Sequence, residues 1–172
     1  MKKIICGTAI LMIIFNQNIF AQSTDSESLI KVLTAYLDLK NALTNDNGDS
    51  ARASGKKLFN AISDVQAETL TAEHKKAWLK YYEKLSYDAG HIKTTDDIEH
   101  QREHFSKLSA NMYKLLGELK INATDLYYQF CSMAKDNKGA YWLSEQAALN
   151  NPYMGKKMPR CGMTKDTIIS VK

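Results

Sequence analysis

The stretch IEHQREHFSKLSANMYKLLGEL, Ile98 to Leu119, carries the clearest structural signal in this chain of 172 residues. Its apolar residues recur at three- and four-residue steps, the spacing that lines one face of an α-helix. The residues on this face are Ile98, Phe105, Leu108, Met112, Leu115 and Leu119. The stretch therefore predicts an amphipathic helix of about six turns, which must bury its apolar face against other elements.

Three similar helices are predicted upstream. The first follows a capping-box pattern at Thr24 and Glu27 and stops near Asn47, and the second spans about 49–64. The third begins after Thr71 and ends near Gly90. The expected inward residues are Leu29, Leu33, Tyr36, Leu37 and Leu43 on the first helix, Ala51, Gly55, Leu58, Phe59 and Ile62 on the second, and Trp78, Tyr81, Tyr82, Leu85 and Ala89 on the third. Small residues early in the second helix would let a neighbour approach closely.

Four amphipathic helices joined by short polar links can bury their apolar faces only against one another. The predicted fold class is therefore all-α, an up-and-down four-helix bundle over about 24–120. After residue 120 the helical pattern stops, and 121–172 is expected to form an irregular, aromatic-rich C-terminal appendage. Within it, 140–148 could form a helix of two turns, and 167–171 favours a strand.

The N-terminus has the three-part pattern of a secretory signal peptide, expected to be removed after Ala21. An uncleaved membrane anchor is the alternative. The mature chain, 22–172, would be a single periplasmic domain without a membrane span. Loss of Lys2 and Lys3 lowers the formal charge from +4 to +2, too small a value to indicate nucleic-acid binding.

Motifs that would indicate catalysis are absent from the sequence. It contains no HExxH metalloprotease motif, no glycine-rich phosphate loop, no GxSxG nucleophile elbow and no CxxC redox pair. We therefore expect a protein that is not an enzyme.

Two short segments of the predicted appendage concentrate sulfur. Cys131 and Met133 lie two residues apart, and Met158 and Cys161 lie three apart in a loop shaped by proline and glycine. Thiolates and thioethers select soft ions, Cu(I) above all. If Cys131 and Met133 were on an extended segment, their sulfur atoms would share one face. The alternatives are a Cys131–Cys161 disulfide, which an oxidising compartment favours, and a pair of buried free thiols.

The four histidines form a second candidate set, of which His74 shares the apolar face of the third helix with Trp78 and is expected to be a core residue. His100 and His104 are four residues apart on the predicted fourth helix, a spacing that can hold a metal ion. They point away from its apolar face, so a solvated pair, dispensable for metal affinity, is expected. His91, at the end of the third helix, is placed to reach another element as an additional ligand.

The stretch CSMAKDNKGAYWLSEQAALNNPYMGKKMPRCG, 131–162, together with 36–47 and 97–109, resembles a family of exported bacterial domains of unassigned function. The family also occurs at the C-terminus of periplasmic adaptor subunits of copper/silver efflux pumps. Its C-terminal pattern runs Cys-Pro-Met-Ala, Trp-Leu-Ser or Trp-Leu-Gln, Asn-Pro-Tyr-aromatic-Gly and Met-x-x-Cys-Gly. This chain departs from it at Ser132, where proline is usual, and at Met154, where an aromatic residue is usual.

The resemblance implies an association with metal-efflux systems and, added to the spacing of the sulfur residues, favours a sulfur site for Cu(I) or Ag(I). The expected ligands are Cys131, Met133, Met158 and Cys161, with His91 and Met154 as additional candidates. Supporting residues that orient the loop would be Trp142, Asn151, Pro152, Tyr153 and Gly155. The expected function is sequestration of the ion or its transfer to an efflux adaptor. The alternative is a non-catalytic protein-interaction module with a structural Cys131–Cys161 disulfide, docking on an adaptor or another envelope protein.

Overall fold

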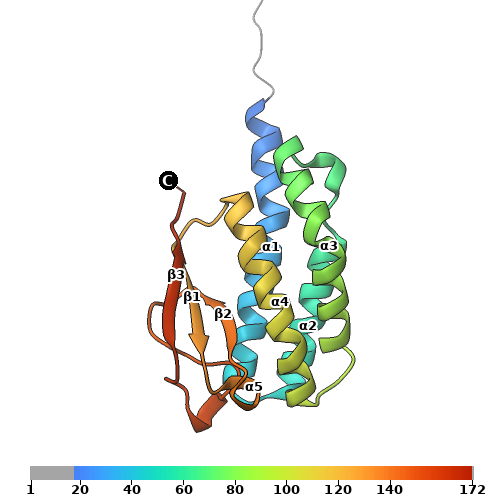
Figure 1. Cartoon of the computed structure of the whole chain (residues 1–172). Coiled ribbons are helices and arrows are strands. Elements are labelled where there is room, and N and C mark those ends of the chain that lie inside the picture. Colours follow the sequence, from blue (N-terminus) through green and yellow to red (C-terminus); the bar gives the residue numbers. More distant parts are fainter. Residues whose placement is uncertain (1–17, 172) are drawn as a thin grey trace, which may run out of the picture.

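The computed structural model describes residues 18–171 and shows a mostly helical protein with one small sheet (Figure 1). The predominance of helix is confirmed. The long helices are α1 (Asn18–Thr44), α2 (Gly48–Ser63), α3 (Ala72–Ile92) and α4 (Ile98–Leu119), with a 3-10 turn at Ala67–Thr69. The strands are β1 (Leu126–Cys131), β2 (Ala140–Ser144) and β3 (Met163–Ile168), with short helices α5 (Ala134–Asn137) and η2 (Gly155–Lys157) between them. The first seventeen residues of the predicted leader lie outside the described residues.

The helices begin where polar side chains satisfy free backbone N–H groups of the first turn. Asn47 accepts a hydrogen bond from the N–H of Ser50 at the start of α2. Thr71 caps α3, as predicted. Asp97 accepts from the N–H groups of Glu99 and His100, so α4 begins at Ile98. Among residues 18–171 no helix combines the length and apolarity needed to cross a bilayer.

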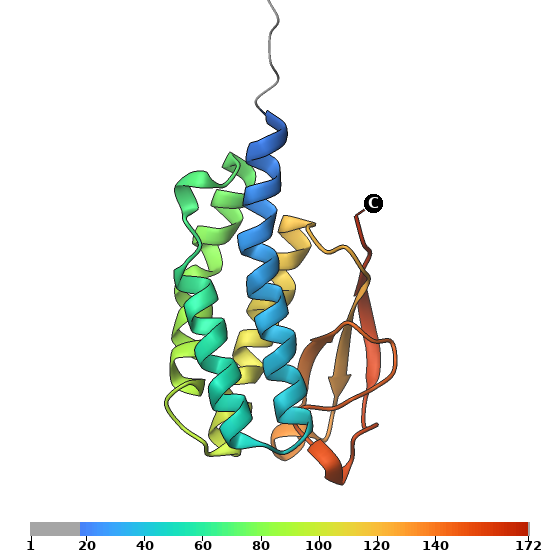
Figure 2. The same ribbon diagram turned by 180° about the vertical axis from the view of Figure 1, so that it is seen from behind.

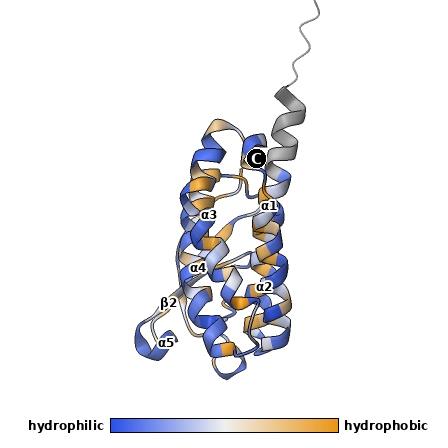
Figure 3. Cartoon of the chain, turned by 90° about the vertical axis from the view of Figure 1, so that its right-hand side faces the viewer, coloured by the Kyte–Doolittle hydropathy of each residue, from blue (hydrophilic) through white to orange (hydrophobic). Residues whose placement is uncertain are grey.

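The apolar faces of the four long helices meet in one core, and Figure 3 shows hydrophobic and hydrophilic residues alternating along them. Phe105, Leu108 and Met112 of α4 are buried, as predicted. The close approach predicted for α2 occurs at Gly55, where an added Cβ would lie 2.6 Å from Cγ2 of Ile92 in α3. A larger residue at this position would push the two helices apart.

We predicted an irregular C-terminal segment, and this prediction is wrong. The segment forms a three-stranded antiparallel sheet in the order β2-β1-β3. The helix predicted at 140–148 is wrong, because Ala140–Ser144 pairs with β1, with Phe130 opposite Tyr141. A short apolar run does not distinguish helix from strand, and the partner strand decides between them.

The sheet packs against α4 and α1 (Figure 2) and shares their core. The hydroxyl of Tyr36 in α1 accepts a hydrogen bond from the N–H of Leu143 in β2 at 3.0 Å and is paired with Ser109 of α4 at 2.8 Å. Lys40 of α1, which is 1% exposed, donates to Glu145 at 2.8 Å. Buried polar bonds of this kind set the position of the sheet on the helices.

Candidate metal centre

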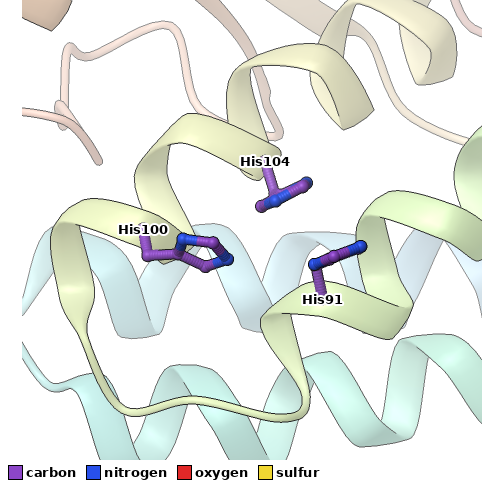
Figure 4. Close-up of side chains that lie close together, drawn as sticks. All are labelled: His91, His100 and His104. Carbon is purple, nitrogen blue, oxygen red and sulfur yellow. The ribbon is translucent and has the colours of Figure 1, made fainter.

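Three histidine side chains meet where α3 ends and α4 begins (Figure 4). His91 is the second-last residue of α3, His100 lies in the first turn of α4, and His104 lies one turn later. A short link, 93–97, joins the two helices, so their adjoining ends lie side by side. Because residues four apart share a helix face, His100 and His104 present their rings together toward His91.

The three rings lie close enough for one ion to draw them together. One nitrogen from each histidine lies within 4.8 Å of the others. The rings of His91 and His104 are stacked at 4.3 Å, and that of His100 lies 4.8 Å from His104. Zn–N bonds are about 2.0–2.1 Å, which puts three nitrogens around one ion about 3.3–3.6 Å apart. The rings of His91 and His104 are nearly parallel, at 7°, so at least one of them would have to turn out of the stack before both nitrogens could face one ion.

The three rings differ in burial, and this difference decides which side of the cluster faces solvent. His104 is 7% exposed, His91 is partly buried and His100 is exposed. The prediction of a solvated His100/His104 pair is therefore wrong for His104, because the packing of α3 on α4 covers it. The cluster opens to solvent on the His100 side.

A buried carboxylate holds the ring of His104. Nδ1 of His104 donates to Oδ1 of Asp88, one turn before His91 on α3, at 2.9 Å. An ionised carboxylate only accepts hydrogen bonds, so Nε2 of His104 carries the lone pair for an ion. Burial raises the pKa of Asp88, and the hydrogen bond with His104 opposes that rise. Carboxylate–histidine pairs of this kind orient metal-binding imidazoles.

Cys131 and Cys161, two of the predicted sulfur ligands, are brought together and form a disulfide with a Cα–Cα distance of 5.9 Å. The bond ties the end of β1 to the loop before β3. In this state neither sulfur is a thiolate, the form that binds metal.

The other predicted sulfur ligands are placed differently. Cys131 ends β1 and is fully buried, whereas Met133 lies in the following turn and is 46% exposed. The extended segment that would give them a common face is therefore not formed. Met158 and Cys161 lie on one turn, in which the N–H of Cys161 donates to the carbonyl of Met158, and Met154 is partly buried. His91 lies in the histidine cluster and not among the cysteines.

The loop around Pro152 is held in shape by Asn151. Its Oδ1 accepts from the N–H groups of Tyr153 and Met154, and its Nδ2 donates to the carbonyl of Cys161 at 2.7 Å. The hydroxyl of Tyr153 donates to the carbonyl of Tyr141 at 2.6 Å. Trp142 is fully buried against this loop, near Gly162. These contacts fix the loop that carries Cys161.

Arg102 anchors the same loop to the helices and was missed by the sequence reasoning. It is 8% exposed and donates to the carbonyls of Pro152 and Leu43 and to Asp46. Gly155 is needed beside it, because its φ is +52° and an added Cβ would lie 1.8 Å from Oδ1 of Asp46. The loop is thus bonded to the turn between α1 and α2.

The fold and the site define a class: a mostly helical domain with a small disulfide-linked sheet and a cluster of three histidines whose nitrogen atoms lie within 4.8 Å of one another. The chain belongs to the family described as protein of unknown function DUF3347, whose model matches residues 32–124, just over half of the chain. This segment contains all three clustered histidines and Asp88, and it ends before β1 and both cysteines. No curated protein and no solved structure gives a significant match.

Proposed function

We propose that this protein binds a transition-metal ion at His91, His100 and His104, and that it sequesters or transfers the ion without catalysing a reaction. One observation carries the proposal: nitrogen atoms from two helices lie within 4.8 Å of one another, with one ring already oriented by a buried carboxylate. Imidazole is a common ligand of zinc, copper, iron and nickel in proteins. The four long helices, which we interpret as an up-and-down bundle, would hold the adjoining ends of α3 and α4 in place.

The cellular setting is part of the same proposal. The leader pattern at 1–21 supports export to the periplasm. The resemblance of residues 131–162 to the C-terminal stretch of copper/silver efflux adaptors supports a role beside an efflux system, with the adaptor as the partner. A site open to solvent on one side suits an ion that is received from, and passed to, another protein.

Metal loading of matched variants tests the proposal. Wild-type protein, offered Zn(II), Cu(II) and Cu(I) separately and then desalted, should retain one ion per chain for at least one metal. The triple variant His91→Ala/His100→Ala/His104→Ala should retain none at this site. His74→Ala is the matched control, because His74 lies in the first turn of α3 and its Nε2 is paired with the carbonyl of Leu119. Equal retention by the triple variant and wild type would reject the proposal.

The cysteine pair supports a second candidate function, the binding of Cu(I) or Ag(I) by sulfur. The folded chain holds the two sulfurs together, so reduction of the bond would leave two thiols side by side, with Met133 and Met158 nearby in sequence. A Cu(I) titration of the reduced protein against Cys131→Ser/Cys161→Ser measures this site separately from the histidines. Unchanged affinity in the double variant would leave the disulfide a structural role, as the interaction-module alternative requires.

A further inference from the structure

The ligand set of the histidine cluster allows the class of ion to be specified, an inference that rests on the proposed function. Neutral imidazole is a borderline nitrogen ligand that suits divalent zinc and copper, whereas Cu(I) and Ag(I) prefer soft sulfur. Within the described residues, the cysteines are joined to each other and the group that could hold a metal consists of histidines alone. The soft ligands and the histidine cluster are therefore separate.

The charges at the cluster also favour a divalent ion. Three neutral imidazoles add no charge, and Asp88, buried behind His104, adds one negative charge through the shared hydrogen bond. A divalent ion would be only partly neutralised by this carboxylate. The remaining positive charge would attract one further donor, either an anion or a polarised neutral molecule such as water.

The number of available ligands leaves one coordination position open. Zn(II) and similar ions take four ligands in a tetrahedron, and sites with three protein ligands keep the fourth position for water or another molecule. Among the described residues, no fourth His, Cys, Asp or Glu joins the three histidines. The exposed side of the cluster, at His100, is where an external donor can approach.

Surface hollows adjoin the cluster on two sides. One lies beside His91 and is lined by the rings of Phe59, Tyr82 and Tyr87. The other lies beside His100 and is lined by charged residues of α4 and of the turn after β1. The ring of Tyr87, 61% exposed, lies 4.5 Å from that of His91. A small molecule can therefore approach His91 and His100 from solvent without movement of a helix.

We infer that the centre holds a borderline divalent ion, of the Zn(II) or Cu(II) class, on three histidines, and that its fourth position binds an exchangeable external donor. His104 is the preset ligand, since Asp88 fixes its ring. His100 is the last ligand to bind, since it is exposed and lies in the first turn of α4. An ion held in this way is exchanged by entry of a donor at the open position.

Co(II), a spectroscopic substitute for Zn(II), tests the inference. Four-coordinate Co(II) absorbs visible light much more strongly than six-coordinate Co(II), and its spectrum responds to each ligand. Wild-type protein with one equivalent of Co(II) should show strong absorption that shifts on addition of imidazole. Weak, six-coordinate absorption, or strong absorption that imidazole leaves unchanged, would overturn the open fourth position.

The outcomes separate this inference from the proposed function. If no metal is retained by the three histidines, the proposed function itself fails. If the histidines retain Cu(I) but neither Co(II) nor Zn(II), metal binding stands and the divalent assignment fails. Each result can be read from the same set of wild-type, triple-histidine and His74→Ala proteins.

Asp88 acts through His104 as a positioning residue, and its variants give an independent measure. Asp88→Asn should lower Co(II) affinity by about 10- to 100-fold, the effect typical of losing a carboxylate behind a metal-binding histidine. It should also change the Co(II) spectrum, which a purely structural role would not do. Asp88→Glu should restore part of the affinity, and Asp38→Asn, an exposed change on α1, should have no effect. Full affinity with an unchanged spectrum in Asp88→Asn would contradict the role.

Discussion

The histidine cluster (His91, His100 and His104) and the cysteine loop (151–162, joined through Cys161 to Cys131) both contain side chains of types that bind metals. They differ in how their side chains are held together. The cysteines are thirty residues apart and covalently joined, and they link the end of β1 to a loop whose backbone is bonded to α4 and to the turn between α1 and α2. The histidines lie within fourteen residues, on two adjoining helix ends, and only His104 is firmly held. The first arrangement suits a permanent structural link, and the second suits an ion that comes and goes.

The two regions also adjoin in space. A polar hollow is lined by His100 and Glu103 of α4 on one side and by Lys135, Asp136 and Lys138 after β1 on the other. Lys135, Asp136 and Asn137 all have left-handed backbone angles, so this turn has an unusual shape. Because the two regions adjoin, their independence can be tested: a change in one region that alters the other would show that they are coupled.

The largest expected effect is loss of the disulfide. Replacing both cysteines in Cys131→Ser/Cys161→Ser should lower the free energy of unfolding by about 3–4 kcal/mol, because the bond closes a long loop. Urea unfolding of the oxidised wild type and the variant measures it. Metal affinity at the histidines should stay unchanged wherever the variant is folded. A matching drop in that affinity would show that the two regions are coupled.

Single histidine variants sharpen the difference within the cluster. His104→Ala should lower Zn(II) affinity by on the order of 100-fold, about 2.7 kcal/mol, because it removes the preset ligand. His100→Ala should cost about tenfold, since water can replace an exposed ligand. Calorimetric titration gives both values. An equal loss for the two variants would show that burial and the bond to Asp88 give His104 no advantage.

The pH dependence of stability tests the anchor of the cysteine loop. Burial acts to raise the pKa of Asp46, but hydrogen bonds from the N–H of Lys156 and from Arg102 outweigh it and lower the pKa. A lowered folded pKa stabilises the protein above the unfolded value, near pH 4, and this contribution is lost as pH falls through the folded value. The stability gap between wild type and Asp46→Asn should therefore be full at pH 6 and shrink below about pH 4. A gap that is constant with pH would refute this.

The smallest expected effect is at Tyr153. Tyr153→Phe removes the hydrogen bond to the carbonyl of Tyr141 and should lower the free energy of unfolding by about 1 kcal/mol. The ring contacts with Phe105 and Trp142 remain in the variant. Thermal unfolding measures the change, for which Tyr127→Phe, on strand β1 of the neighbouring sheet, is the comparison. Larger destabilisation by Tyr127→Phe would show that the hydrogen bond of Tyr153 is not a main link between the loop and the sheet.

Most of the helical fold could be predicted from the residues, because helix signals are local. The spacing of Phe105, Leu108 and Met112 predicts the buried face of α4, and the polar residues at Thr71 and Asp97 mark helix starts. The sheet could not be predicted in the same way, because a strand such as Ala140–Ser144 needs a partner elsewhere in the chain. Its five residues read equally well as a turn of helix.

The candidate site was predicted in part. His91 was identified as a residue able to reach another element, and His100 and His104 as a possible pair, but not as one group of three. Asp88 and Arg102 were missed, because a charged residue on a helix usually faces water. The signal that could have pointed to Asp88 is its spacing from His91, since residues three apart share a helix face.

By itself, the sequence determined four amphipathic helices, the cap of α3 at Thr71, and the presence of two sulfur-rich segments, because each depends on residues a few positions apart. The start predicted at Thr24 is wrong, because α1 begins at Asn18. Only the tertiary structure decided which groups meet. Packing α3 on α4 buries His104 beside Asp88 and turns a pair of histidines into a cluster of three. Folding of the sheet joins Cys131 to Cys161 and leaves Met133 exposed. Contacts between distant residues depend on how whole elements pack, and no local pattern encodes that.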